Sequence, residues 1–262
     1  MLCSIPTKLQ TYIKNNGKST MDQVENHSPQ AIKDRLASGL TVSYLREWVY
    51  GGIDGVVTTF AIAAGVVGAN LSPKIILILG AANLIGDGFS MAAGCYSATK
   101  TENDNYQRLR NREISHIKKY PEGEREEIRQ IYAAKGFKNE TLETIVKTIS
   151  EDPKLWVDVM MAEEYGLSSR PLSAMKTAYH TFFAFFICGA VPLLPFLMKV
   201  SEPFLWACIF SALTFFAIGA GKSIWSFKPW WWHGLETTII GSTAAGMAFT
   251  IGYWLRFLGL EG

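Results

Sequence analysis

The chain has 262 residues, of which 48% are hydrophobic, and its formal net charge is +2 at pH 7. So small a charge gives no reason to expect a nucleic-acid partner. The composition divides sharply along the chain, because residues 1–47 and 99–171 are polar or charged and nearly all the rest is apolar. Polar loops would interrupt a soluble core more often, so this division predicts an integral membrane protein.

Residues 1–47 lack the apolar run of a cleavable signal peptide, so we expect a cytosolic N-terminal tail. A membrane-spanning helix needs about 20 apolar residues. Five segments have that length: 48–71, 75–98, 172–198, 203–221 and 235–257. The sequence therefore predicts an all-α integral membrane protein with five transmembrane helices. Its expected parts are the tail 1–47, spans one and two in 48–98, a cytosolic helical insertion at 99–171, spans three to five in 172–257, and a C-terminal end at 258–262.

The distribution of basic residues predicts which side of the membrane each loop occupies. Six Lys and Arg precede residue 48 and thirteen lie in residues 99–171, whereas the loops on the other side hold only Lys74 and Lys199. We therefore expect the tail and the insertion in the cytosol and the C-terminus on the opposite side. The membrane would be vacuolar in a eukaryote and the inner, or plasma, membrane in a bacterium.

The first predicted span, with the stretch "YGGIDGVVTTF", carries a carboxylate at Asp54. A charged side chain inside a span costs about 3 kcal/mol, so it is usually functional or paired. Gly51 and Gly55 form a step of small residues that lets another helix approach closely.

The second predicted span places four side chains that can ligate a metal on one helical face. They are Asn83, Asp87, Met91 and Cys95, each four residues after the last. Met91 lies at a similar depth to Asp54, and an oxygen and a sulfur at one level favour a borderline ion such as Fe(II). Met and Cys are also ordinary membrane residues, so packing is the alternative. Asp87 would bind a cation or a returning proton if it faces a hydrated path.

The fifth predicted span opens on "HGLETTIIG", with Glu236 near its cytosolic end. Two interpretations stay open for this residue. It either faces the same path or lies at the interface with water.

Helix start and stop signals divide the insertion into four expected helices. The first continues the second span to about Lys119, and the second begins with Pro121 in its first turn and stops at Gly136. Asn139 can cap a short third helix, and Asp152 with Pro153 starts the fourth, which ends at Gly166.

In the insertion, three pairs of possible metal ligands lie one helical turn apart: Glu113 with His116, Glu124 with Glu127, and Met160 with Glu164. Each pair alone is more typical of a solvated helix face, whereas the three together could converge on one ion. The stretch "EISH" also matches the Glu-x-x-His element of di-iron bundles. No second such element occurs in the sequence, which argues against a ferroxidase.

Taken in order, several stretches resemble the vacuolar iron transporter family. They are "GGIDGVVTTFAIAAGVVGA", "NLIGDGFSMAAG", "YPEGEREEIRQIYAAKGF", "EDPKLWVDVMMAEEYGL" and "GLETTIIG", and the resemblance covers roughly residues 45–258. It implies a five-span homodimer with the ion path at the dimer interface and a cytosolic metal-binding domain. The implied activity is export of Fe(II), often also Mn(II), from the cytosol in exchange for protons, with no enzyme activity and no cofactor.

The resemblance also implies roles for single residues. Asp54 and Met91 match path residues of the family. The positions of the family's cytosolic ligands fall on Glu113, Glu124, Glu127, Met160 and Glu164. Two residues depart from the pattern, because His116 and Cys95 stand where Glu is usual, and they would favour Zn(II) or Co(II) beside Fe(II). The alternative function is a membrane-anchored iron-binding sensor or storage protein without transport, which metal flux into liposomes would separate from a transporter.

Overall fold

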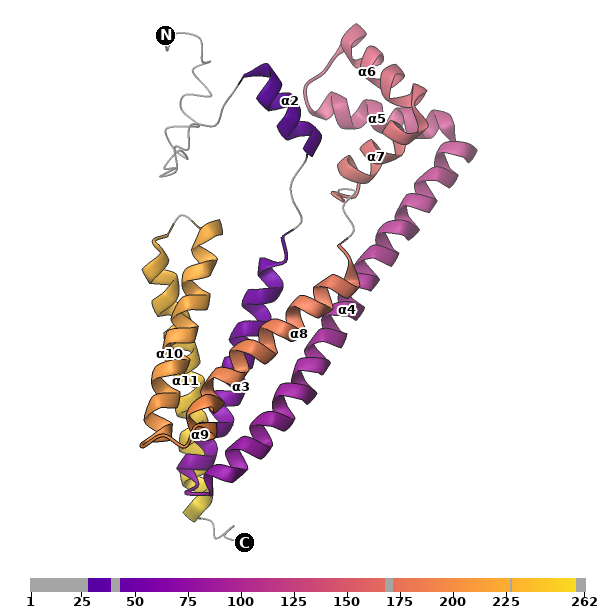
Figure 1. Cartoon of the computed structure of the whole chain (residues 1–262). Coiled ribbons are helices and arrows are strands. Elements are labelled where there is room, and N and C mark those ends of the chain that lie inside the picture. Colours follow the sequence, from indigo (N-terminus) through magenta and orange to yellow (C-terminus); the bar gives the residue numbers. More distant parts are fainter. Residues whose placement is uncertain (1–27, 39–42, 168–171, 227, 258–262) are drawn as a thin grey trace. The chain divides into compact units, whose positions relative to one another are not determined.

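The computed structural model of the chain describes residues 28–38, 43–167, 172–226 and 228–257. Within these ranges all regular structure is helical, which confirms the predicted class. The elements in chain order are α2 (Pro29–Ser38), α3 (Leu45–Gly68), α4 (Pro73–Lys119), α5 (Pro121–Ala134), α6 (Asn139–Glu151), α7 (Pro153–Glu163), α8 (Ala174–Ala190), η1 (Val191–Leu193), α9 (Leu194–Leu197), α10 (Pro203–Gly221), η2 (Lys222–Trp225) and α11 (Trp230–Phe257) (Figure 1). The expected end at 258–262 and most of the expected tail lie outside the described residues.

Four described helical segments are long and apolar enough to cross a membrane. They are Leu45–Gly68, Pro73–Lys119, Ala174–Leu197 and Pro203–Ile224, and they contain most of the first four predicted spans. The fifth predicted span lies in α11, a helix of 28 residues that falls outside this set. Its many Gly and Thr residues dilute the apolar ones. The count of five therefore stays a prediction.

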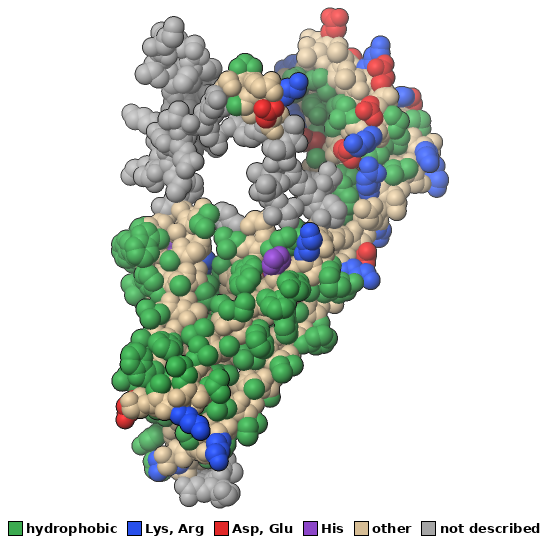
Figure 2. Space-filling model, viewed as in Figure 1, with side chains coloured by type: hydrophobic (Ala, Val, Ile, Leu, Met, Phe, Trp, Pro, Cys, Tyr) green, Lys and Arg blue, Asp and Glu red, His purple; other side chains and the backbone are tan. Residues whose placement is uncertain are grey.

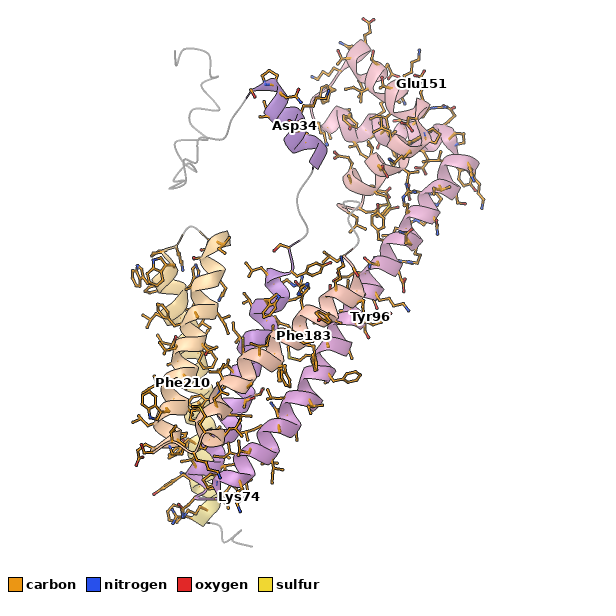
Figure 3. All side chains as sticks on the ribbon, viewed as in Figure 1. Asp34, Lys74, Tyr96, Glu151, Phe183 and Phe210 are labelled. Atoms are coloured by element: carbon orange, nitrogen blue, oxygen red, sulfur yellow. The ribbon has the colours of Figure 1, made fainter. Side chains whose placement is uncertain are left out.

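The chain forms two compact units. The first consists of Met1–Ile85 with Ala184–Gly262, and the second of Gly86–Phe183. Helices α4 and α8 each contribute to both units. On the visible face, hydrophobic side chains cover the helices of the first unit, such as α10, which carries the labelled Phe210 (Figures 2 and 3). Charged side chains gather over α5, α6 and α7 of the second unit (Figure 2).

In the first unit, α3 packs against α10 and α11 around buried apolar side chains such as Val56, Ala63 and Phe215. Gly55 of α3 lies so close to the backbone of Phe185 in α8 that a Cβ would clash with the Phe185 carbonyl oxygen. This is the close helix approach that the small-residue step in the first span predicts.

In the second unit, α5, α6 and α7 enclose a hydrophobic core. Its fully or nearly fully buried members are Ile128, Leu142, Val146, Ile149, Trp156 and Met160. Asp152 caps α7 by accepting hydrogen bonds from the backbone N–H groups of Lys154 and Leu155 at 2.9 and 3.2 Å, as its place before Pro153 predicts. These helices form a small apolar core that fixes the charged residues around it.

The start of α6 differs from the sequence prediction. We expected Asn139 to cap this helix, but it is the first helical residue, and Lys138 precedes it without a side-chain cap. Asn139 has a φ of 53°, in the left-handed region that Asn tolerates better than most residues. The expected stop of α5 at Gly136 is confirmed, because Gly136 adopts a φ of 100° just after the helix.

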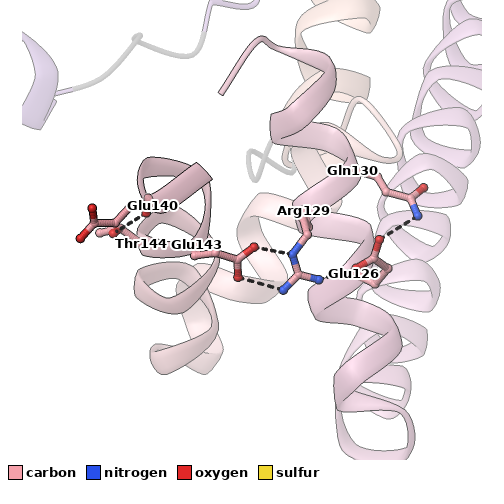
Figure 4. Close-up of polar contacts among 6 residues, drawn as sticks. All are labelled: Glu126, Arg129, Gln130, Glu140, Glu143 and Thr144. Atoms are coloured by element: carbon pink, nitrogen blue, oxygen red, sulfur yellow. Dashed lines mark hydrogen bonds and ion pairs between the residues drawn. The ribbon is translucent and has the colours of Figure 1, made fainter. Parts of the chain in front are cut away.

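An ion-pair network joins α5 to α6 (Figure 4). The Arg129 guanidinium donates from Nε and Nη2 to the two carboxylate oxygens of Glu143, at 2.8 and 3.0 Å. Arg129 also pairs with Glu126, whose Oε1 accepts from Gln130 Nε2 at 3.1 Å. Each carboxylate of this network therefore has a donor within the protein.

Candidate metal centre

Three of the predicted ligands come together where α4 ends and α5 begins. Glu113 and His116 lie one turn apart on α4, and Glu124 lies on the first turn of α5. One ligand atom from each of the three lies within 4.8 Å of the other two. The chain turns between the helices at Tyr120, and Pro121 starts α5 at once, so Glu124 reaches the end of α4.

The distances and burial within this cluster suit a cation. His116 Nδ1 lies 3.3 Å from Glu124 Oε1 and 4.0 Å from Glu113 Oε1. Glu113 is 1% exposed and Glu124 is 4% exposed, whereas the His116 side chain is 41% exposed. The Oε2 atoms of Glu113 and Glu124 are buried without a hydrogen-bond partner among the described residues. A buried carboxylate oxygen without a partner is costly, and a bound cation would relieve that cost.

The negative charges around the cluster also favour a bound cation. Burial, together with the negative charges of Glu127 and Glu113, raises the pKa of Glu124 to about 7. Burial also raises the pKa of Glu164, and the charges of Glu113 and Glu127 add to that rise. Several carboxylates thus share a region of negative potential that attracts divalent cations.

The other three predicted cytosolic ligands stand apart from this group. Glu127 and Glu164 are exposed, and neither belongs to the group with converging ligand atoms. Met160 is fully buried and packs in the core of the second unit with Ile128 and Trp156. In this structure Met160 is a packing residue. A role for these three in metal binding stays a prediction.

The predicted path residues are found on α3, α4 and α11. Asp54 is half-buried and lines an open pocket of about 540 Å³, which Arg46, Lys222 and His233 also line. Asn83 Nδ2 donates to Thr58 Oγ1 at 3.1 Å and so ties α4 to α3.

The remaining four lie in different environments. Asp87 is exposed, Met91 and Cys95 are half-buried, and Glu236 is exposed with Oε2 3.4 Å from His233 Nδ1. Asp54 and Met91 belong to different units, so their shared depth stays a prediction. Glu236 next to His233 is compatible with either interpretation offered for it.

Two residues near the metal cluster are missing from the sequence prediction. Tyr165 donates from its hydroxyl to Glu113 Oε1 at 2.7 Å, and Arg112 donates from Nη2 to the same hydroxyl. The Arg112 guanidinium also lies over the Tyr165 ring, 5.4 Å from its centroid. The signal was weak, because Tyr165 is separated from Glu113 by 52 residues and Arg112 looks like one basic residue among many on α4.

Comparisons with known proteins agree with the resemblance seen in the motifs. The sequence model of the VIT family matches residues 45–253. "Vacuolar iron transporter" of Centaurea cyanus is 33% identical over 78% of this chain and 85% of its own length. "Vacuolar iron transporter 1" of Arabidopsis thaliana is 31% identical over 79% and 84%. "Vacuolar iron transporter" of Toxoplasma gondii is 34% identical over 78% of this chain and 68% of its own length.

Proposed function

The chain belongs to the VIT family, a family of transporters and not of enzymes, and from that premise we propose that it carries Fe(II) across a membrane. The observation that carries this proposal is the cluster of Glu113, His116 and Glu124. It joins an imidazole to two buried carboxylates, each with one oxygen that has no hydrogen-bond partner in the described part of the chain. Relatives from two plants and an apicomplexan carry iron transport in their names.

The donor set of this cluster fits a borderline divalent ion. Carboxylate oxygens alone would suit Mg(II) or Ca(II), whereas an imidazole nitrogen beside them favours Fe(II), Co(II) or Zn(II). Glu124 ligates in its charged form, and its pKa is raised to about 7, so metal binding there competes with a proton near neutral pH. The cluster is the proposed collecting site for the ion before transport.

The proposed path uses Asp54 and Met91, with Asp87, Asn83, Cys95 and Glu236 as further polar positions. Fe(II), and Mn(II) beside it, leaves the cytosol in exchange for protons, and a homodimer builds the path from two copies. The half-buried position of Asp54 in an open pocket supports a role in which water and ions reach it. Residues 1–47 and 99–171 face the cytosol, in agreement with the distribution of Lys and Arg.

Metal uptake into proteoliposomes with an imposed pH gradient tests this function. We expect Fe(II) flux that depends on the gradient and falls strongly in Asp54→Asn, because that change removes the charge and keeps the shape. Met91→Leu keeps the volume and removes the sulfur, so preference for Fe(II) over Mn(II) should weaken. Thermal melts of the same purified variants separate a lost path from a lost fold.

Three results would contradict the proposal in different ways. Metal binding without any flux would identify a sensor or storage protein. Full Fe(II) flux in Asp54→Asn would remove Asp54 from the path. Oxygen-dependent Fe(II) oxidation by the purified protein would support a ferroxidase, the activity that the single Glu-x-x-His element argues against.

A further inference from the structure

Tyr165 reaches the metal cluster from the end of a different helix. It follows Glu164, the C-cap residue of α7, and it precedes Gly166, whose φ of 65° turns the chain. The backbone N–H of Leu167 then donates to the Met161 carbonyl at 2.9 Å and closes this turn. The turn holds the Tyr165 ring against α4, where its hydroxyl meets Arg112 and Glu113.

The direction of the hydrogen bonds follows from the chemistry of the partners. A guanidinium has donors and no acceptor, so the Tyr165 oxygen accepts from Arg112. The phenol has a single proton, which is therefore left for a carboxylate, and Glu113 Oε1 lies at 2.7 Å. The two hydrogen bonds therefore run in one direction, from Arg112 to Tyr165 and from Tyr165 to Glu113.

This arrangement places a neutral group between a cation and a metal ligand. Arg112 Nε already makes a loose ion pair with Glu113 Oε1 at 3.8 Å, and a small movement would tighten it into a hydrogen-bonded pair. Arginine binds carboxylates through two parallel hydrogen bonds that occupy both oxygens. With Tyr165 in place, Glu113 Oε1 has its donor while Oε2 is left without a partner among the described residues.

We propose that Tyr165 is a positioning residue of the metal centre, which fixes the Glu113 carboxylate through Oε1 and keeps Arg112 from occupying both of its oxygens, so that the carboxylate stays free to bind the ion. The inference rests on the proposed function, because it requires that Glu113 is a metal ligand. It adds Arg112 and Tyr165 to the residues that set metal affinity. Neither residue touches the ion itself.

The test measures Fe(II) binding to the purified full chain by anaerobic titration calorimetry. Tyr165→Phe keeps the ring and its contact with Arg112 and removes only the hydroxyl. We expect about a tenfold loss of Fe(II) affinity, the size of one hydrogen bond to a charged group. Without the hydroxyl, Arg112 closes onto both oxygens of Glu113, so Arg112→Met combined with Tyr165→Phe should recover most of the loss. Recovery by a second deletion separates positioning from a structural defect, even if Tyr165→Phe melts earlier.

Two further variants separate the possible failures. Tyr132→Phe makes the same chemical change on α5, at a ring that packs against Phe137 and the core, and it should bind Fe(II) as the parent does. Glu113→Ala should abolish tight binding. If Glu113→Ala binds normally, the proposed metal centre is wrong. If Glu113→Ala loses binding while Tyr165→Phe keeps it, or if the double variant stays as weak as Tyr165→Phe, the inference about Tyr165 is wrong and the metal centre stands.

Discussion

Helix α5 carries two groups of carboxylates whose environments are opposite. Glu126 on α5 and Glu143 on α6 are both exposed and both pair with Arg129. Hydrogen bonds from Gln130 and Arg129 lower the pKa of Glu126, and those from Arg129 lower the pKa of Glu143. Glu124 is buried beside Glu113, lacks a partner on one oxygen among the described residues, and has a pKa raised to about 7. The two carboxylates of the first group share one fixed cation of the protein, Arg129.

The difference shows how to separate a structural ion pair from a binding site. In sequence the two groups look alike, since Glu124 and Glu126 lie two residues apart in "YPEGEREEIRQ". What separates them is how positive charge reaches the carboxylates. Arg129 donates hydrogen bonds to both oxygens of Glu143 and pairs with Glu126, whereas Arg112 lies 3.8 Å from Glu113 and donates to Tyr165 instead. Buried acids that keep an unpartnered oxygen among the described residues are expected to take a cation from solution.

The largest expected effect is on metal affinity. Glu113→Ala combined with Glu124→Ala removes both buried carboxylates, and we expect Fe(II) affinity to fall by about a hundredfold or more, because each ligand contributes on the order of 1.4 kcal/mol or more. Glu126→Ala combined with Glu143→Ala removes two carboxylates as well and should leave affinity nearly unchanged. Calorimetric titration of the two double variants measures both, and equal losses would erase the distinction between the groups.

A smaller effect is expected on the choice of metal. His116→Glu turns the mixed donor set into three carboxylates and removes the nitrogen ligand. We expect Zn(II) and Co(II) affinity to fall by about tenfold relative to Mn(II), because nitrogen favours the former ions and oxygen suits the latter. Competition titrations with the three ions measure the ratio. An unchanged ratio would mean that His116, although 3.3 Å from Glu124, is not a ligand.

Sequence patterns predicted the helices well because their signals are local. The apolar lengths of four spans, Pro121 and Pro153 at helix starts, and Gly136 after a helix all depend on near neighbours in the chain. The count of five spans was less secure, because the Gly and Thr residues of α11 reduce its apolar character. Asn139 was assigned to a cap, and its left-handed φ was not visible in the sequence.

The metal cluster was predictable only in part. One-turn spacing gave Glu113 with His116 and placed Glu124 on the next helix, and these three meet. The same spacing also selected Met160, which packs in the core, and its role as a ligand stays a prediction because burial alone does not decide it. Tyr165 depends on a contact across 52 residues, which no local pattern reveals.

The pH dependence of folding distinguishes the two groups without any metal. The Glu124 pKa is about 7 in the folded chain and about 4.5 when the group is free, so the folded state holds the extra proton between these values. The contribution of Glu124 to the free energy of unfolding is therefore fully present below about pH 4.5, where the group is protonated in both states. It is lost as the pH rises through 7, because the folded state must then bury a charged carboxylate. Glu124→Gln should therefore unfold less readily than the parent at pH 8, by on the order of 1 kcal/mol after allowing for solvent screening, and the difference should shrink towards pH 5. Unfolding without metal at several pH values measures this, and a constant difference between parent and variant would contradict the buried, proton-binding state of Glu124.

The smallest expected effect comes from breaking the exposed ion-pair network around Arg129. Arg129→Met removes the cation shared by Glu126 and Glu143 and keeps the aliphatic stem over the helix surface. Exposed ion pairs contribute little and are screened by salt, so the melting temperature should fall by no more than about 2 °C, and less at high salt. Fe(II) affinity should not change, because Arg129 supplies charge to the exposed group and not to Glu124. Thermal melts at low and high salt, with a parallel Fe(II) titration, measure the two quantities. A gain in Fe(II) affinity at low salt would show that the charge of Arg129 acts on the buried cluster as well, and the two groups of α5 would then differ in their distance from this cation and not only in pairing with it.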